Sequence, residues 1–398
     1  MRKDDGDRSG QISMSGPDLT DAEREAVAAV LRTPRLSVGP QVDTFEAVVA
    51  DRVGAKHAIA VNSGTAGLHL CVRAVGITDG DWVITTPFSF IASSNVLLYE
   101  RAIPVFVDVE PLTGNIDPVL VAEAAADLRE GGAVARRWLP PRGAPDDGEL
   151  KAILTVDVFG QPADYDQLAI TATRHGLRTI EDSCEAIGST YKDRQAGTLG
   201  DIGVFAFYPN KQITTGEGGI VVTNHDDWAS MVRALRNQGR APGDTWLEHS
   251  YLGYNYRMDE MCAALGRVQM SRLDELLGKR ERVAGWYNER LKSLPEVELP
   301  SLAPSTTRIS WFVYVIRLDP SIDRREVMER MKSRGVPSRP YFVPIHLQPH
   351  YIERFGYQPS HYPVTEDLGQ RSLALPFSGV MSEDDVAYVC EALRHSLR

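Results

Sequence analysis

A chain of 398 residues is longer than most single compact domains, so its length predicts two domains. Its hydrophobic content of 43% and charged content of 24% are typical of a soluble globular protein. The net charge of −11 argues against nucleic acid or an anionic membrane as the main partner, because both would repel an acidic surface. No apolar run approaches the roughly 20 residues that are needed to span a bilayer.

The N-terminal residues, 1–12, are polar and lack the apolar core of a signal peptide, so we expect a disordered lead-in. The four cysteines, Cys71, Cys184, Cys262 and Cys390, are scattered and form no CxxC pair. Such spacing is typical of free thiols and indicates no metal site. We therefore expect a cytoplasmic protein without a metal ion.

Short β-branched strands alternate with helical segments through the first two-thirds of the chain. The periodicity predicts helices over 19–32, 64–76 and 89–101, and the first opens with a Thr-x-x-Glu capping box. It predicts strands over 56–63, 81–88, 103–110, 150–160, 177–183, 201–209 and 219–224. This alternation indicates an α/β fold with a mostly parallel sheet between helices, whose ligands bind beyond the carboxyl ends of the strands.

Two regions depart from the alternation. Residues 129–149 are rich in Gly, Pro and charge, and they predict an exposed excursion of unknown role. From residue 261 onward a long helical stretch leads to a predicted strand at 309–318 and a helix at 324–335 that ends at Gly335. We therefore expect a large domain at 13–260 and a smaller α+β domain at 261–398.

A turn at residues 62–67, NSGTAG, joins a predicted strand to a helix. Gly64 permits close approach of the backbone, Ser63 and Thr65 offer hydroxyls, and the free N–H groups at a helix N-terminus attract phosphate. Taken alone, this turn is equally typical of an ordinary capped helix.

Aromatic and acidic residues follow two further strands. In PFSF (87–90), Phe88 and Phe90 suit a hydrophobic core, although one of them could stack on a planar ring. In IEDSCEA (180–186), two acids close a buried strand, which is costly unless they are solvated or paired. A carboxylate there could hold the protonated nitrogen of a heteroaromatic ring, although acids are also favoured at helix N-termini.

Lys211 lies in FYPNKQITTGEGG (207–219), after another predicted strand. Most lysines are solvated, but a lysine becomes nucleophilic when burial or a nearby cation lowers its pKa. Together, the four segments supply a phosphate site, a stacking aromatic, an acid for a pyridine nitrogen and an amine. Pyridoxal 5′-phosphate needs all four groups.

The chain resembles the DegT/DnrJ/EryC1/StrS family of sugar aminotransferases from about residue 12 to its C-terminus. This resemblance implies the fold-type-I architecture of aspartate aminotransferase, with a mostly parallel seven-stranded sheet and a smaller C-terminal α+β domain. The motifs that carry it, in the order of the family, are LSVGPQVDTFE (36–46), NSGTAGLHL (62–70), VFGQPADYD (158–166), EDSCEAIGS (181–189), GDIGVFAFYPNKQITTGEGG (200–219), GYNYRMDEMCAALGRVQM (253–270) and YFVPIHLQPHY (341–351).

The resemblance assigns a role to each matching position. Lys211 matches the lysine that forms a Schiff base with the cofactor, and Asp182 matches the acid that keeps the pyridine nitrogen protonated. Phe90 matches the aromatic that stacks on the ring. Two positions depart from the pattern: Glu185 stands where Gln commonly contacts the ring oxygen, and Ala206 stands where Ser commonly helps to bind phosphate.

By the same resemblance, Gly64, Thr65 and Ala66 match the phosphate-binding turn. Asn255 matches a residue that reaches the phosphate from the neighbouring subunit, and Arg257 beside it would strengthen that anion site. The resemblance therefore implies a homodimer with a composite active site.

The family implies transfer of an amino group, with L-glutamate as the expected donor and a keto-sugar on a nucleoside diphosphate as the expected acceptor. Family members that remove a sugar hydroxyl carry His in place of the lysine, so Lys211 argues against a lyase. Arg257, Tyr341, Phe342 and His346 are candidates for substrate contacts, although His346 could equally be structural. Two alternatives remain open: an aminotransferase for a cyclitol or related ketone, and a regulatory sensor that binds the cofactor without turnover.

Overall fold

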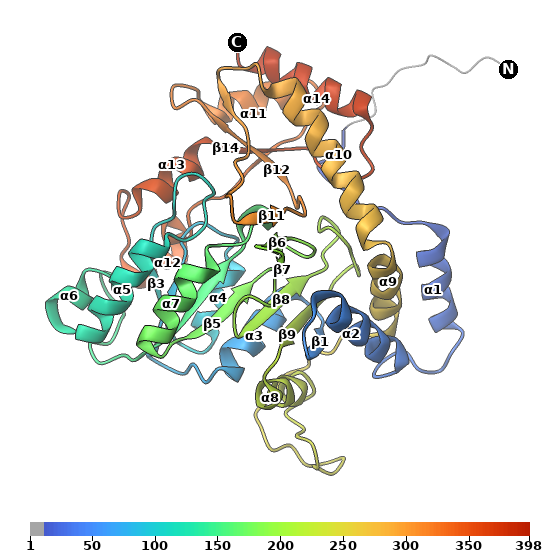
Figure 1. Cartoon of the computed structure of the whole chain (residues 1–398), viewed down its shortest axis with the longest axis vertical. Coiled ribbons are helices and arrows are strands. Elements are labelled where there is room, and N and C mark those ends of the chain that lie inside the picture. Colours follow the sequence, from blue (N-terminus) through green and yellow to red (C-terminus); the bar gives the residue numbers. More distant parts are fainter. Residues whose placement is uncertain (1–11) are drawn as a thin grey trace.

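The computed structural model describes residues 12–398, so the predicted lead-in lies outside the described residues apart from Ile12. Figure 1 shows a large lower body built around a sheet, a smaller upper part, and helix α10 (Leu273–Leu291) running between them. Within residues 12–398, no helix combines the length and the apolar character that a membrane span requires.

A seven-stranded sheet forms the centre of the lower body. It contains all seven strands that the sequence predicts, each shorter than its predicted segment. In spatial order the strands are β1 (His57–Val61), β9 (Gly219–Thr223), β8 (Ile202–Ala206), β5 (Arg178–Asp182), β4 (Leu150–Val156), β2 (Trp82–Thr85) and β3 (Ile103–Phe106).

Strand β9 runs antiparallel to both of its neighbours, β1 and β8, whereas the remaining pairs of the sheet are parallel. The other six strands therefore point the same way, and their carboxyl ends lie along one edge. This arrangement confirms the predicted α/β class with a mostly parallel sheet.

Helices cover both faces of this sheet, because successive side chains of a strand point to opposite faces. In β1, Ile59 and Val61 pack on one face, and Ala58 and Ala60 pack on the other. The first face is covered by α3 (Gly64–Ala74), α4 (Ala92–Tyr99) and α8 (Asp226–Arg236). The second is covered by α2 (Pro40–Val53), α5 (Pro118–Glu130), α7 (Tyr165–His175) and α9 (Glu260–Ser271), and α1 (Asp21–Leu31) packs against α9.

The upper part contains an antiparallel sheet of four strands in the order β10 (Val297–Glu298), β12 (Tyr314–Leu318), β14 (Ser372–Leu375) and β13 (Arg339–Pro340). Its core also takes residues from α10, α11 (Arg324–Ser333) and α14 (Glu383–Ser396). The predicted strand at 309–318 is correct only from Tyr314. Before it, Ser310 and Phe312 contact Ser189 and Lys211 of the lower body instead of pairing with a strand of the upper sheet.

Shorter elements connect the two parts. They are the sheet β11 (Thr306–Arg308), β6 (Thr190–Tyr191) and β7 (Arg194–Gln195), the 3-10 turns η1 (Val158–Gly160) and η2 (Ile345–Leu347), and the helices α12 (Pro349–Phe355) and α13 (Pro363–Arg371). Side chains of α12 pack in the core of the lower body, although the helix lies far along the chain.

The long helical stretch after residue 260 is two helices, α9 and α10, which meet at Arg272. Helix α9 and the first turns of α10, up to Leu277, pack on the large sheet. From Val283 onward, α10 packs in the core of the upper part. We propose that the domain boundary lies within α10, between Leu277 and Val283, rather than at residue 260.

The segment 129–149 is not a wholly exposed excursion. It contains the end of α5 and the short helix α6 (Gly132–Arg136), and Leu139 is buried against the lower body. The Trp138 indole donates to Asp127, and the Arg142 backbone N–H donates to the carbonyl of Phe355 in α12. The segment is therefore anchored at three points, which its Gly and Pro content did not predict.

Glu260 joins α9 to the N-terminus of α2. Its carboxylate is 1% exposed and accepts the backbone N–H groups of Gly39 (3.0 Å), Gln41 (2.9 Å) and Val42 (3.1 Å). These donors have no partner within the helix, so the side chain satisfies groups that burial would otherwise leave unpaired.

We expect Glu260→Ala to lower the free energy of unfolding by about 2–3 kcal/mol, because it leaves buried donors unsatisfied. Glu260→Gln should cost less, since one acceptor oxygen remains. Urea unfolding measures both, with Glu281→Gln on the exposed side of α10 as the control. A Glu260→Ala variant as stable as this control would contradict the proposed role.

Candidate active site

A cavity of about 340 Å³ lies at the carboxyl edge of the large sheet. Turns that follow β1, β2, β5 and β8 all contribute to its wall, as expected for a parallel sheet. The lining side chains come from the segments singled out in the sequence, together with residues of the upper part. They include Ser63, Gly64, Thr65, Ser89, Phe90, Ser93, Asp182, Cys184, Glu185, Ala206, Tyr208, Lys211, Glu217, Phe312, Tyr341 and Phe342.

Lys211 enters this cavity from the turn after β8. Its backbone N–H donates to the carbonyl of Tyr208 at 2.9 Å, which closes the turn. The Nζ atom lies 3.6 Å from Glu185 Oε1 and 3.9 Å from the centre of the Phe312 ring. The side chain is 12% exposed, so Lys211 is not the solvated surface cation that most lysines are.

Asp182 ends strand β5 and is 5% exposed. Ser93 Oγ donates to its Oδ2 at 2.6 Å, and the Cys184 backbone N–H donates to its Oδ1 at 3.2 Å. Both oxygens are thus held by neutral donors, and no ion pair within residues 12–398 neutralises the carboxylate. It is therefore available for a cationic ligand group.

Glu185 is a neighbour of Lys211 and interacts electrostatically with Asp182. The Phe159 backbone N–H donates to its Oε2 at 3.0 Å, and Oε1 faces the lysine amine. Burial raises the pKa of Glu185, the charge of Lys211 opposes this rise, and Asp182 adds to it. The residue that departs from the family pattern is thus an ionisable neighbour of the Lys211 amine.

The turn before α3 has little free space around its glycine. Ser63 Oγ accepts the Ala66 N–H at 3.1 Å, so Ala66 is occupied in capping the helix and does not line the cavity. A Cβ on Gly64 would lie 2.6 Å from Ala206 Cβ and 2.9 Å from Cys184 Sγ. Only glycine fits there, and Ala206 contributes a methyl group where the family pattern has a hydroxyl.

The two phenylalanines after β2 have different environments. Phe88 is 1% exposed and packs edge-on against Phe159 and Phe342, which makes it a core residue. Phe90 is 61% exposed and lines the cavity. Of the two aromatics, Phe90 is the one whose ring is free to meet a ligand.

Asn255 and Arg257 do not line the cavity of their own chain. The Asn255 carbonyl accepts from the Asn62 side chain at 3.3 Å, and Arg257 donates to the Asn237 side chain at 3.0 Å. A single chain therefore does not bring these two residues to Lys211.

The three aromatic residues expected at the substrate mouth do not all lie there. Tyr341 and Phe342 line the cavity, whereas His346 is fully buried outside it. The His346 ring lies 3.0 Å from Glu366 and packs against Tyr362, and burial lowers its pKa although Glu366 opposes the shift. The structure thus agrees with the structural alternative for His346.

Two residues of the site were not identified from the sequence. Ser93 lies three residues after Phe90, close to the start of α4, so one helical turn separates the two cavity positions. Phe312 is contributed from beyond residue 300, and no local pattern relates it to Lys211. Its position depends on how the upper part packs on the lower one.

A second group of acids lies on the other side of β5, behind Asp182. Ser183 Oγ is 2.5 Å from Asp157 Oδ2 and 2.9 Å from Glu181 Oε1, and both acids are fully buried. One hydroxyl proton cannot donate fully to two carboxylates at once, so the two acids compete for it. Backbone N–H groups of Gly197, Leu199 and Gly200 donate to Glu181, which favours its charged form.

Burial raises the pKa values of both acids, and the backbone N–H donors of Glu181 oppose this rise. Burial raises the pKa of Asp157 well above its ordinary value, and the charge of Glu181 raises it further. The Tyr165 hydroxyl donates to the other oxygen of Asp157 at 3.0 Å, so the acid is fully bonded. This network holds the end of β5, and with it Asp182, in place.

The donor set of the cavity fits pyridoxal 5′-phosphate. It offers a buried amine at Lys211, a carboxylate at Asp182 for a protonated ring nitrogen, an open aromatic face at Phe90, and a helix N-terminus whose Gly64 leaves room for a close approach.

The model of the DegT/DnrJ/EryC1/StrS aminotransferase family matches residues 17–394. The chain belongs to this family. It is therefore an aminotransferase that uses pyridoxal 5′-phosphate.

Individual members of the family resemble the chain over nearly their whole length. GDP-perosamine synthase of Caulobacter vibrioides is 38% identical over 387 residues, which covers 96% of this chain and 97% of the relative. The dTDP-3-amino-3,4,6-trideoxy-alpha-D-glucose transaminase of Streptomyces venezuelae is 33% identical, over 93% of this chain and 90% of the relative. The structure of Helicobacter pylori PseC, an aminotransferase in pseudoaminic acid biosynthesis, gives a TM-score of 0.86 at 27% identity. The match covers 97% of this chain and 99% of PseC.

We expect Asp157→Asn to gain stability relative to the wild type as the pH rises above 3.8, the ordinary aspartate value. The raised pKa means that the folded wild type binds this proton more tightly than the unfolded chain does. The stability that this proton contributes is fully present below the pKa of the unfolded chain. It is lost as the pH rises through the raised pKa of the folded protein. The amide of the Asp157→Asn variant donates a hydrogen bond at every pH, so the variant loses no stability in this range.

Urea unfolding at a series of pH values measures this difference. Asp166→Asn is the control, because Lys192 lowers the pKa of the exposed Asp166 and its contribution has the opposite sign. If the free energies of unfolding of the two variants changed in the same way with pH, the raised pKa of Asp157 would be refuted.

Proposed function

We propose that this aminotransferase moves an amino group from L-glutamate to the keto group of a nucleotide-linked sugar. The observation that carries the proposal is that Lys211 and Asp182 line the same cavity, which adjoins a larger one. The relatives named above support the acceptor, since two of their names specify a GDP-linked or dTDP-linked amino sugar.

The larger cavity, of about 570 Å³, shares a wall with the first one, including Phe90, Tyr208 and Tyr341. Most of its lining is aromatic, aliphatic or uncharged, and Arg339 is its one charged side chain among residues 12–398. Aromatic faces suit a nucleobase or sugar ring, and a guanidinium suits a diphosphate. These features support a large, anionic acceptor.

Bound pyridoxal 5′-phosphate supplies an electron-accepting ring that makes a proton on the adjacent carbon of the substrate removable. Asp182 would hold the positive charge at the ring nitrogen, and Ser93 fixes the orientation of its carboxylate. Lys211 Nζ, mostly shielded from water, takes a proton from the amino donor and returns one to the acceptor. Phe90 and the turn at Gly64 would hold the ring and the phosphate.

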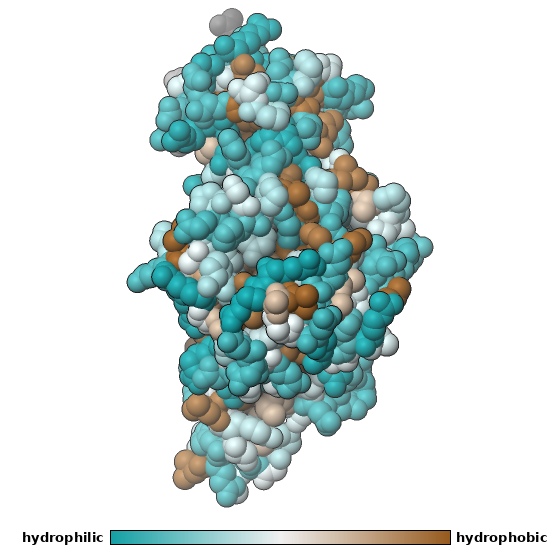
Figure 2. Space-filling view, turned by 90° about the vertical axis from the view of Figure 1, so that its left-hand side faces the viewer, coloured by the Kyte–Doolittle hydropathy of each residue, from teal (hydrophilic) through white to brown (hydrophobic). Residues whose placement is uncertain are grey.

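A homodimer with composite sites belongs to the same proposal. The loop after α8, residues 239–253, extends from the lower end of the molecule in Figure 1, and hydrophobic residues appear at this end in Figure 2. Its Trp246, Leu247 and Leu252 are 77%, 83% and 80% exposed. Apolar side chains this exposed favour a protein partner, and a second copy would bring its Asn255 and Arg257 toward Lys211.

Four free cysteines are compatible with the reducing environment of the cytoplasm, where we propose that the enzyme acts.

We expect Lys211→Ala to lower the rate of amino transfer by about 10³-fold or more, because no other amine of residues 12–398 lines the cavity to move the proton. The measurement follows the cofactor absorbance with L-glutamate and a panel of nucleotide-linked keto-sugars. Lys192→Ala, an exposed lysine paired with Asp166, is the control. Borohydride should fix the cofactor to Lys211 in the wild type.

Normal turnover by Lys211→Ala would refute its assignment. If only cyclitol ketones accepted the amine, the sugar acceptor would be refuted. An absorbance that no amino acid changes would identify a sensor instead of an enzyme.

Co-expression of Lys211→Ala with Asn255→Ala tests the composite site. We expect each variant alone to be nearly inactive, whereas mixed dimers regain part of the activity, because one of their two sites receives Lys211 from one copy and Asn255 from the other. Failure to regain activity in mixed dimers, isolated by two affinity tags, would contradict the composite site.

A further inference from the structure

Arg280, in the middle of α10, is a buried cation without a counter-ion. Its side chain is 3% exposed, and no carboxylate forms an ion pair with it in the part of the chain that the structure describes. Burial lowers the pKa of its guanidinium to about 10. In contrast, the well-covered Arg236 and Arg272 are paired with acids.

Four backbone carbonyls satisfy this guanidinium. Its NH2 group donates to Lys211 O at 2.6 Å and to Asn210 O at 3.3 Å. Its NH1 group donates to Trp311 O at 3.2 Å and to Phe312 O at 3.1 Å. A buried charge is costly, and only the full set of bonds to a planar, forked donor makes it tolerable.

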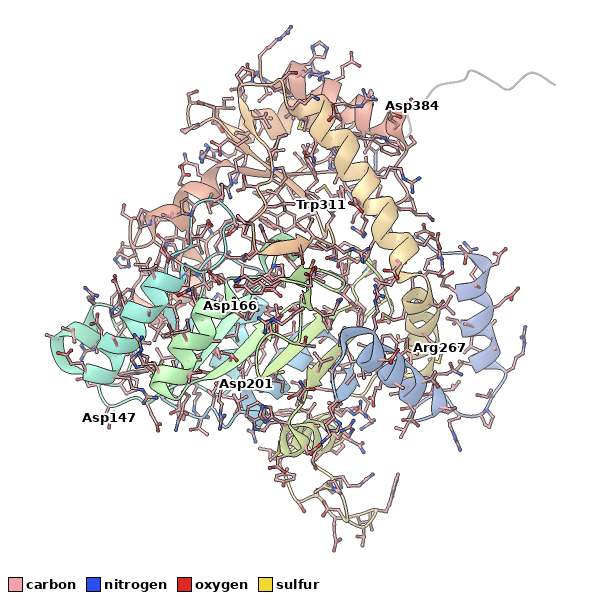
Figure 3. The ribbon with its side chains drawn as sticks, in the orientation of Figure 1. Asp147, Asp166, Asp201, Arg267, Trp311 and Asp384 are labelled. Carbon is pink, nitrogen blue, oxygen red and sulfur yellow. The ribbon has the colours of Figure 1, made fainter. Side chains whose placement is uncertain are left out.

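The four carbonyls belong to two segments that lie about a hundred residues apart in the sequence. One is the turn that carries Lys211, and the other leads into β12 of the upper part. Figure 3 shows Trp311 beside α10, between the upper sheet and the lower body. One guanidinium thus joins the reactive turn to the upper part.

The same two segments meet again inside the cavity. The Phe312 ring centre lies 3.9 Å from Lys211 Nζ, a distance at which an aromatic face favours a protonated amine. Because Arg280 fixes the backbone of both residues, it also fixes the distance between the amine and the ring.

We propose that Arg280 is a positioning residue of the active site: it holds the Lys211 turn against Phe312, so that the amine keeps its place beside the ring. The inference rests on the proposed function, in that Lys211 must carry the cofactor. Arg280 lines neither the cofactor cavity nor the larger one, so it acts through Lys211 and Phe312.

The test compares Arg280→Lys with Arg317→Lys in the holoenzyme. A lysine keeps the charge of Arg280 but has no fork that reaches both pairs of carbonyls. Arg317 is a matched control, because it also joins the upper part to backbone carbonyls of the lower body, those of Pro111 and Leu112, away from the lysine turn.

We expect Arg280→Lys to lower the pH at which the lysine-bound cofactor changes its absorbance, since the amine loses its aromatic contact. It should lower kcat about 10²-fold and leave KM for L-glutamate within about twofold, as misplacement of a reacting group does. Arg317→Lys should change neither quantity. The other titratable groups of the cavity are common to all variants: Asp182, Cys184, Glu185, Tyr208, Glu217 and Tyr341.

Phe312→Leu keeps the hydrogen bonds of Arg280 and removes only the aromatic ring. It therefore provides a second test of the inference if Arg280→Lys folds poorly. It should shift the absorbance midpoint in the same direction. The inference is overturned if Phe312→Leu leaves the midpoint unchanged, or if Arg280→Lys and Arg317→Lys lower kcat equally. Borohydride trapping distinguishes a failure of the proposed function from a failure of this inference. If no cofactor is trapped on Lys211 of the wild type, the proposed function is refuted. If the variants trap the cofactor and keep the wild-type absorbance midpoint, only the role of Arg280 is refuted.

Discussion

The placement of one lysine depends on a single reversed strand. Because β9 runs antiparallel to β8, the chain must turn back directly after it has passed the carboxyl edge of the sheet. Phe207 is bonded to both Gly218 and Thr215, so the turn that carries Lys211 is closed by the same ladder that joins the two strands. A flexible loop would leave the amine free to reach water. Here its backbone is fixed before any ligand arrives.

The acids around this amine have different properties because their donors differ. Asp182 receives two neutral hydrogen bonds and faces the cavity, whereas Glu181, one residue earlier, points to the opposite face and receives three backbone N–H groups. Asp157 shares the Ser183 hydroxyl with Glu181, and burial raises its pKa well above the ordinary value. Alternation along one strand thus separates a carboxylate for ligand binding from a pair that only supports it.

Local patterns predicted the parts of the molecule that local physics determines. The seven strands, the helices between them and the edge where Ser63, Phe90, Asp182 and Lys211 gather all follow from periodicity and from the rule for parallel sheets. The roles of single residues needed the family resemblance, because a lysine or an acid after a strand has several ordinary explanations.

Features that depend on tertiary packing were not predictable in this way. Phe88 and Phe90 are two residues apart and chemically identical, yet one is core and the other open. The burial of His346 beside Glu366 and the anchoring of 129–149 depend on distant segments, α12 and α13 among them. The break between α9 and α10 and the contact of Phe312 with Lys211 likewise depend on how the upper part sits on the lower one.

Helix α10 begins in the core of the lower body and ends in that of the upper part. With 19 residues it is about 28 Å long, and a continuous helix resists bending. Its two ends therefore cannot move independently. Any tilt of the upper part about the lower one would carry the helix as a rod that its first turns anchor in the lower body. Arg280 lies only three residues beyond the anchored Leu277, so it would travel less than the far end of the helix, and so would the backbone carbonyls of Lys211 and Phe312 that it holds.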